Sequence, residues 1–271
     1  MGNITGDEYK SLQDYIYNTL GIEVDDSKKE TVAAKIDKLA RRNGMNEMGE
    51  YIDYILQTSD SGAIQEFIND ITTNTTEFFR EPVHFDYIKH NIGSIIGDIP
   101  RIKSDREICL WSAACSSGEE PVTLAIVLKE CLPRDTDISV KILATDISEK
   151  ILRKAVKGIY TETECKGMPK EYIYKYFRKL PDGSFQVNEE IKKCVTYRLF
   201  NLMNGFKFQK GFDIVFCRNV MIYLNSAVQQ KLINKFYDVI VPNGLFFTGH
   251  SESMINKEHK FRYIQNALYK K

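Results

Sequence analysis

The chain lacks several features that would assign it at once to a class of protein. Its 37 basic and 37 acidic residues leave a net charge of zero, so no global positive field draws it to nucleic acid or to a membrane surface. No apolar run approaches the ~18 residues of a membrane-spanning helix. The polar N-terminus has no signal-peptide pattern. We therefore expect a cytoplasmic protein that does not bind nucleic acid.

Metal-binding spacings are also missing. The six cysteines are scattered, and none forms a C-x-x-C pair or has a histidine nearby in zinc spacing. We expect no metal and no disulfide, and we expect the cysteines in apolar runs to be buried thiols. Free thiols of this kind are typical of a reducing cytoplasm.

The two common phosphate-binding motifs, G-x-G-x-x-G and the P-loop with its lysine, do not occur. Instead, an apolar strand ending near Trp111 runs into small residues and then into Glu119-Glu120-Pro121, which opens an apolar helix. Small residues let a ligand approach the backbone, and a helix start offers unpaired N–H groups. Two carboxylates there repel a pyrophosphate but suit a cation. S-adenosylmethionine, with its ammonium and its sulfonium, is such a ligand.

Apolar periodicity divides the chain in two. Residues 1–85 carry four stripes at helical spacing, which predict an all-α domain. Residues 86–271 alternate strands with helices, the pattern of an α/β fold with a mostly parallel, Rossmann-like sheet. A small antiparallel β flap is predicted as an insertion at 160–198. We predict strands at 107–112, 140–145, 195–200, 212–217, 244–249 and 261–269, and helices at 119–132, 148–156 and 226–240.

In such a sheet the ligand lies beyond the carboxyl ends of the strands. Asp146, directly after a predicted strand, could hold the two hydroxyls of a ribose or could cap the helix that begins near Ser148. Asn201 and Asn219 follow later strands. Each could read an adenine edge, and each could equally be a turn residue.

A polar and aromatic segment, residues 72–82, precedes the sheet. Its threonines and asparagine stand beside Phe78, Phe79 and Arg80. The segment could form the lid of a pocket. The alternative is a capped helix start with both phenylalanines in the core.

These motifs, taken in order, resemble the chemotaxis receptor methyltransferases of the CheR family. The resemblance runs from Ile71 to Tyr269. It is carried by TTNxTxFFR at 72–80, WSAAxSxGEEP at 111–121, ATDI at 144–147, GIY at 158–160, Asn201-Leu202, FDxxFCRNVMIY at 212–223 and GHSE at 249–252.

The resemblance implies a class I methyltransferase fold and the activity of a protein-glutamate O-methyltransferase. Such an enzyme transfers a methyl group from S-adenosylmethionine to receptor glutamates, leaves S-adenosylhomocysteine, and serves adaptation in bacterial chemotaxis. Its partners are the cytoplasmic helices of the receptors, so its contact with the membrane is indirect.

The resemblance also implies the site residues. Arg80 and Tyr223 are expected to face the sulfur and the incoming carboxylate as catalytic residues. Glu120 rather than Glu119 is expected at the methionine moiety, although by charge alone either could serve. The expected cofactor-binding residues are Asn74, Thr76, Arg80, Glu120, Asp146, Asn201, Leu202, Arg218 and Asn219.

Methyl transfer to a glutamate needs no general base, because a carboxyl with a pKa near ~4.3 is already ionised at neutral pH. The absence of a catalytic His–Asp pair or cysteine is therefore compatible with this activity. His250 is expected to be a structural residue.

One predicted helix has a basic side opposite Val32, Ile36 and Leu39. Charged helix faces are usually only solvated, but the resemblance favours docking beside a glutamate-rich receptor helix. The docking residues expected on it are Lys28, Lys35, Lys38, Arg41 and Arg42. The flap segment is short, which favours an enzyme that does not bind a receptor tether peptide.

Two other functions stay open on the sequence. One is a methyltransferase with another substrate, such as a small molecule or RNA. The other is a cofactor sensor without catalytic activity.

Overall fold

The computed structural model describes residues 4–133, 135–254 and 256–271, and its contacts divide the chain into two compact units. The helical unit holds the chain up to Thr73 together with Tyr223–Val228. The α/β unit holds Asn74–Ile222 and Gln229–Lys271. The division falls before the expected boundary at residue 85, because Phe78 is buried in the α/β unit against the ring of Tyr160, at 4.8 Å between centroids.

The helical unit is built from amphipathic helices that bury one face each. Thr5 and Glu8 form a capping box at the start of the first helix, and Gly21 ends that helix with a left-handed φ of 71°. The helices are α1 (Gly6–Leu20), α2 (Lys29–Arg42), α3 (Met48–Gln57) and α4 (Ser61–Ile71), with a 3-10 turn η1 (Asp26–Lys28) before α2.

Among the described residues, the centre of the α/β unit is a seven-stranded sheet with the strand order β6-β2-β1-β7-β8-β10-β9. The first five strands in this order are parallel, and β10 and β9 pair antiparallel at the edge. The strands are β1 (Glu107–Ala113), β2 (Ser139–Asp146), β6 (Val195–Leu199), β7 (Phe212–Cys217), β8 (Ile240–Thr248), β9 (Arg262–Gln265) and β10 (Leu268–Lys270).

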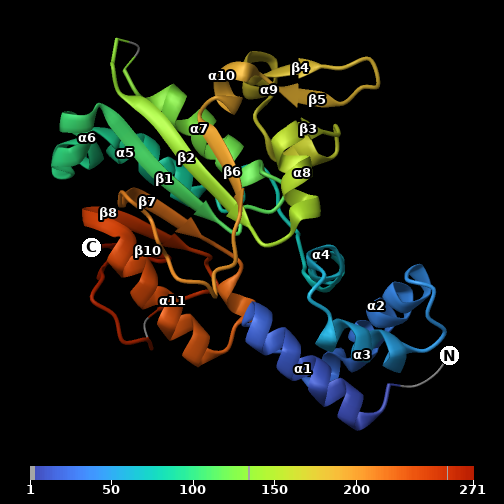
Figure 1. Cartoon of the computed structure of the whole chain (residues 1–271). Coiled ribbons are helices and arrows are strands. Elements are labelled where there is room, and N and C mark those ends of the chain that lie inside the picture. Colours follow the sequence, from blue (N-terminus) through green and yellow to red (C-terminus); the bar gives the residue numbers. More distant parts are fainter. Residues whose placement is uncertain (1–3, 134, 255) are drawn as a thin grey trace. The chain divides into compact units, whose positions relative to one another are not determined.

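Helices cover both faces of this sheet, which is why β1 and β7 are buried almost throughout. Leu110 of β1 packs in the apolar cluster that includes residues of α5 (Val83–Asp98) and α7 (Glu119–Cys131). The next residue, Trp111, points to the other face and meets Phe236 of α11 (Ser226–Val239) at 5.2 Å between ring centroids. Figure 1 shows α5 and α7 behind the strands and α11 in front of them.

Between β2 and β6 the chain forms α8 (Glu149–Lys157) and then a small flap. The flap's sheet has the antiparallel order β3-β5-β4. Figure 1 shows it in yellow, beyond α8. Its elements are β3 (Ile159–Tyr160), η2 (Glu164–Gly167), α9 (Lys170–Tyr176), β4 (Phe177–Lys179), β5 (Phe185–Val187) and α10 (Glu189–Lys192).

The predicted fold class is confirmed, and the bounds of each predicted parallel strand differ from those observed by no more than four residues. The single last strand expected at 261–269 is wrong. Ala267 adopts a left-handed φ of 57° and turns the chain there, so the segment folds as β9 and β10. Helices α5 and α6 (Pro100–Asp105) had no predicted counterpart. No helix among the described residues has the length and apolarity needed to cross a membrane.

We expect Gly118→Ala to destabilise the α/β unit by about 1–3 kcal/mol. Gly118 has a φ of 95°, and a Cβ there would stand 2.9 Å from the Cβ of Ala155. Chemical denaturation followed by circular dichroism measures the change. Gly93→Ala is the matched control, because nothing lies within 4 Å of its added Cβ inside α5. Equal stability of the two variants would contradict the steric argument.

Candidate active site at the carboxyl ends of the strands

The loops that follow β1, β2 and β7 meet at one edge of the sheet, because these three strands are parallel neighbours. The loop after β1 is bonded directly to the end of β2. Cys115 N–H donates to the carbonyl of Thr145 at 2.8 Å, and Ser116 N–H donates to the carboxylate of Asp146 at 2.9 Å. The segments that carry the expected site residues therefore meet at this edge of the sheet.

The loop after β1 has an unusual backbone. Ala114 and Ser116 adopt left-handed φ values of 61° and 50°, which few residues other than glycine do. The Ser116 hydroxyl donates to the carbonyl of Asn74 at 2.8 Å. This hydrogen bond joins the loop after β1 to the 72–82 segment.

Asp146 is not the cap of α8. Ser148 takes that role, because its hydroxyl accepts the N–H of Ile151 at 3.3 Å. The Asp146 carboxylate instead accepts Ser148 N–H at 3.0 Å with one oxygen and Ser116 N–H with the other. Burial raises the pKa of Asp146, and these backbone hydrogen bonds oppose the rise. The residue ties the two loops together at the strand ends.

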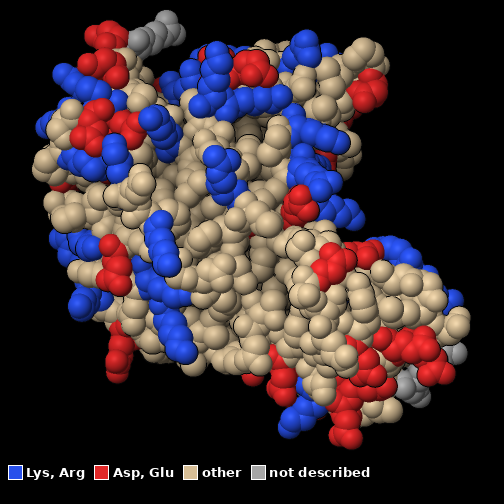
Figure 2. Space-filling view, in the orientation of Figure 1, with Lys and Arg blue, Asp and Glu red and all other residues tan. Residues whose placement is uncertain are grey.

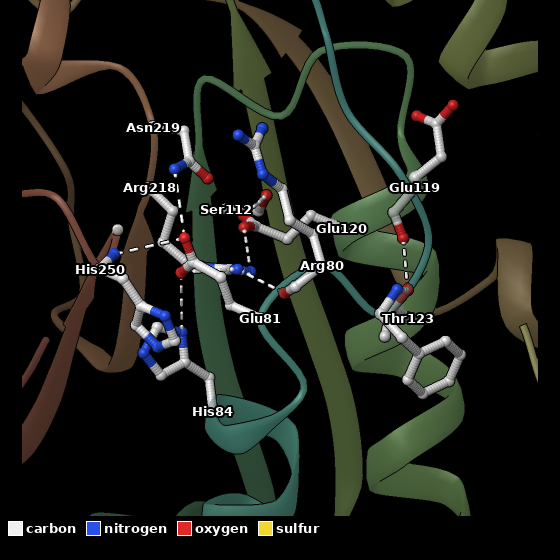
Figure 3. Close-up of polar contacts among 12 residues, drawn as sticks. Arg80, Glu81, His84, Ser112, Glu119, Glu120, Thr123, Arg218, Asn219 and His250 are labelled. Atoms are coloured by element: carbon white, nitrogen blue, oxygen red, sulfur yellow. Dashed lines mark hydrogen bonds and ion pairs between the residues drawn. The ribbon is translucent and has the colours of Figure 1, made fainter. Parts of the chain in front are cut away.

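Arg218, the first residue after β7, is the centre of a buried polar network. Its side chain is only 2% exposed. Its guanidinium donates to Glu120 at 3.1 Å and to Glu81 at 3.0 Å, and also to the carbonyl of Arg80. The hydroxyl of Ser112, on β1, donates to Glu120 at 2.7 Å. Figure 3 shows these side chains converging from β1, α7, β7 and the 72–82 segment.

The two adjacent carboxylates of α7 have different environments. Burial raises the pKa of Glu120, and the charge of Arg218 counteracts it. Glu119 accepts from the hydroxyl of Ser117 at 2.7 Å. Figure 3 shows the Glu119 side chain directed away from Arg218. Only Glu120 of this pair joins the network.

Glu252 organises the loops after β7 and β8. Its carboxylate is buried and accepts the N–H groups of Gly249 at 2.6 Å, Asn219 at 2.8 Å and Ile222 at 3.2 Å. Burial raises its pKa, and the three N–H donors oppose that rise. Asn219 is thereby held in a left-handed conformation, with φ of 57°. Its side-chain amide donates to Glu81 at 3.3 Å.

The remaining predicted residues lie nearby with less defined contacts. Arg80 is half-buried, and its guanidinium donates to the carbonyl of Thr75 at 3.1 Å. Asn201 accepts Met203 N–H with its side-chain oxygen at 2.8 Å, which makes it a turn residue in this structure. Thr76 is half-buried and Leu202 is buried. The 72–82 segment is itself not helical, but α5 begins directly after it, with Pro82 at the N-cap position and no side-chain cap. Phe78 is a core residue, and Phe79 is partly buried against the same core.

Tyr223 and the basic residues of α2 belong to the helical unit. The carbonyl of Tyr223 accepts Glu23 N–H at 3.1 Å. On α2, the Lys35 ammonium donates to the carbonyl of Ile71 at 3.0 Å, and Arg42 pairs with Glu66 and Asp70. Lys35 and Arg42 therefore help to hold the helical unit together.

The charges of the network suit a cationic ligand. The carboxylates of Glu81 and Glu120 share the guanidinium of Arg218, while the carboxylate of Glu252 is bonded to backbone N–H groups of the adjoining loops. The cluster thus carries more negative than positive groups at the sheet edge where ligands of this fold bind. A molecule with an ammonium and a sulfonium matches that balance, and a pyrophosphate does not.

The parallel β1, β2 and β7, the bent loop after β1 and the acidic start of α7 define the fold of a class I S-adenosylmethionine-dependent methyltransferase. Residues 74–269 match the family described as "CheR methyltransferase, SAM binding domain", and residues 7–72 match "CheR methyltransferase, all-alpha domain". The chain therefore belongs to the CheR methyltransferase family. It is an enzyme that uses S-adenosylmethionine as its methyl donor.

Individual relatives agree with this assignment. A chemotaxis protein methyltransferase of Borreliella burgdorferi is 40% identical over 271 residues, which cover 99% of this chain and 95% of that protein. One of Escherichia coli is 33% identical over 265 residues, covering 96% and 89%. Among solved structures, the glycopeptide N-methyltransferase MtfA is 11% identical with a TM-score of 0.34, over 55% of this chain and 52% of that one.

The sequence did not single out four residues of this site. Ser112 and Glu252 stand inside quoted motifs, and Glu81 and His84 follow Arg80 closely. Their types alone gave no reason to assign them a role. The only local sign of a site was the spacing of Glu81 and His84, a carboxylate three residues before a histidine. This spacing is common at helix starts.

We expect Glu120→Gln to weaken binding of S-adenosylmethionine about tenfold or more, because the site loses a negative charge and the charge of Arg218 is then less compensated against a cationic ligand. Titration calorimetry measures the affinity. Glu119→Gln is the control, because Glu119 is bonded to Ser117 and not to Arg218. A larger loss in the Glu119 variant would reverse the assignment of the two carboxylates.

Proposed function

We propose that this enzyme methylates glutamate side chains of chemotaxis receptors at the strand-end site, leaving glutamate methyl esters and S-adenosylhomocysteine. The observation that carries the proposal is the buried Glu120–Arg218–Glu81 network at the ends of β1 and β7. Membership of the CheR family supports the choice of substrate. Receptor helices in the cytoplasm would be its partners, with no role for nucleic acid. Figure 2 shows both basic and acidic side chains on the face that it draws.

The donor would lie across the carboxyl ends of β1, β2 and β7. Glu120, held by Ser112 and Arg218, would bind the methionine ammonium. Asp146 would face the ribose. Those carboxylates keep part of their hydrogen-bonding capacity, because an ionised carboxylate has about four acceptor positions. The full set proposed for the donor is Asn74, Thr76, Arg80, Glu120, Asp146, Asn201, Leu202, Arg218 and Asn219.

The chemistry asks little acid–base work of the protein. S-adenosylmethionine supplies a methyl group bound to a positively charged sulfur. A receptor glutamate with a pKa near ~4.3 is ionised at neutral pH. Its carboxylate oxygen forms the new C–O bond while the C–S bond breaks, and the electron pair of that bond stays on sulfur. No proton moves, so alignment of the two reactants and exclusion of water are what the protein contributes.

Arg80 and Tyr223 are the residues proposed to align the incoming carboxylate. The guanidinium of Arg80 is half-buried and uses one nitrogen for the carbonyl of Thr75. The rest of its planar fork can bind a carboxylate with two hydrogen bonds. The hydroxyl of Tyr223 can direct the second oxygen, and its ring can face the sulfonium.

We expect Arg80→Ala and Tyr223→Phe to lower methyl transfer by about 100-fold or more while each retains much of its affinity for S-adenosylmethionine. The reason is that orientation of the reactants, rather than donor binding, is lost. Transfer is measured with tritiated donor, and affinity is measured by calorimetry. An affinity loss as large as the rate loss would remove these residues from the catalytic role.

Receptor docking is proposed on the basic side of α2. The structure narrows the face, because Lys35 and Arg42 are engaged inside the helical unit. Lys28, Lys38 and Arg41 are exposed, and Arg41 pairs with Asp37 on its own helix at 3.0 Å. Lys28 and Lys38 are thus the side chains best placed to meet acidic groups of a receptor helix.

We expect the double variant Lys28→Glu, Lys38→Glu to slow receptor methylation about threefold or more at low salt, because rim charges mainly set the rate of encounter. The effect should shrink as salt is added. Lys10→Glu is the control, an exposed lysine on α1. Donor affinity should stay unchanged in both. If the control variant slowed methylation equally, docking on α2 would be wrong.

The function as a whole is tested with labelled S-adenosylmethionine and receptor-containing membranes. Glutamate methyl esters release labelled methanol in alkali, whereas N-methyl groups and methylated RNA do not. Label that resists alkali would indicate a different substrate. Donor binding without any transfer to the membranes would indicate a sensor.

A further inference from the structure

Next to Arg218, the carboxylate of Glu81 stands close to two histidines that have no role in the proposed methyl transfer. Glu81, His84 and His250 each offer one ligand atom, and these atoms all lie within 4.8 Å of one another. Figure 3 shows the two imidazole rings side by side near the Glu81 carboxylate. Their ring centroids are 5.0 Å apart. All three residues belong to the α/β unit.

His84 is the unusual member. Its side chain is fully buried, yet among the described residues neither of its ring nitrogens has a hydrogen-bond partner. Buried polar atoms are nearly always satisfied, so two open nitrogens on one ring call for a ligand. Nδ1 stands 3.6 Å from Glu81 Oε2, which is too long for a hydrogen bond.

Glu81 is held loosely for a carboxylate with four donors. Three donors lie 3.3 Å from its oxygens: Arg218 Nε, the side-chain amide of Asn219 and the backbone N–H of His250. Arg218 Nη2 lies at 3.0 Å. Charge-assisted hydrogen bonds in proteins are usually about 2.7–2.9 Å long. A metal ion that binds Glu81 would therefore have to replace one of these longer hydrogen bonds.

We propose that Glu81, His84 and His250 form a binding site for one divalent transition-metal ion of the zinc type. Two imidazoles and a carboxylate are a common zinc ligand set, whereas magnesium and calcium prefer oxygen ligands throughout. Around a tetrahedral zinc ion, ligand atoms lie about 3.3 Å apart. The 3.6 Å between His84 and Glu81 is already close to that value.

Access and charge also favour a metal ion here. His250 is exposed, so its ring can turn and close on an ion arriving from solvent. Arg218 would oppose a cation, but it is shared with Glu120 at 3.1 Å. Glu252 adds a further carboxylate to the same loops. A fourth ligand position would remain for water.

The test uses the full chain, free of donor, and Zn²⁺ alone. Competition with a chromophoric chelator should give one tight site per chain. We expect His250→Gln and Glu81→Gln each to weaken Zn²⁺ binding about tenfold or more. The reason is that loss of a direct ligand costs at least as much affinity as loss of a group that hydrogen-bonds to a ligand. His90→Gln is the matched control: it is an exposed histidine of α5 outside the cluster and should bind as the unaltered chain does.

Six free cysteines could bind zinc by themselves, so the ligand atoms must also be identified. X-ray absorption of the Zn²⁺-loaded protein should show nitrogen and oxygen neighbours near 2.0–2.1 Å and no sulfur near 2.3 Å. Sulfur scattering, or unchanged affinity in the His250 and Glu81 variants, would overturn the proposal, as would the absence of a tight site. None of these readouts requires methyl transfer, so they stand apart from the proposed function.

Discussion

The interaction on which the rest of the site depends is the contact of the buried Arg218 guanidinium with two half-buried carboxylates. Glu120 starts α7, and Glu81 belongs to the segment before α5, so one side chain fixes two elements against the end of β7. A guanidinium can do this because its donors diverge in one plane. Without that charge, both carboxylates would stand in a poorly solvated place without compensation.

This arrangement explains why the sheet edge can receive a cation. Burial raises the pKa of Glu120, because solvation of the charged form is costly there, and the charge of Arg218 opposes that rise. A ligand with its own positive charge lowers that cost when it binds. In the proposed site the charged groups are already in place before the ligand binds, so that little reorganisation would be needed during methyl transfer.

Much of the fold could be predicted from local pattern. The alternation of apolar strands and helices after Glu107 gave the parallel sheet, because strands buried on both faces are nearly continuous apolar runs. Helix α5 was not predicted, because its apolar residues follow the helical spacing only weakly. The neighbours His84 and Phe85 are both buried, so a polar residue lies on its buried face. The segment predicted as one final strand forms two strands, because Ala267 takes a left-handed φ between them. An alanine in the sequence gives no sign of that conformation.

The sequence by itself determined the family and the chemistry, because ordered motifs such as WSAAxSxGEEP and FCRNVMIY carry both. Only the tertiary structure decided which neighbours act together. Glu120 joins Arg218 and Glu119 does not, and His84 meets His250, which lies 166 positions further along the chain. Helix rotation and strand order set these contacts, and both follow from packing of the whole unit, so spacing along the chain cannot express them.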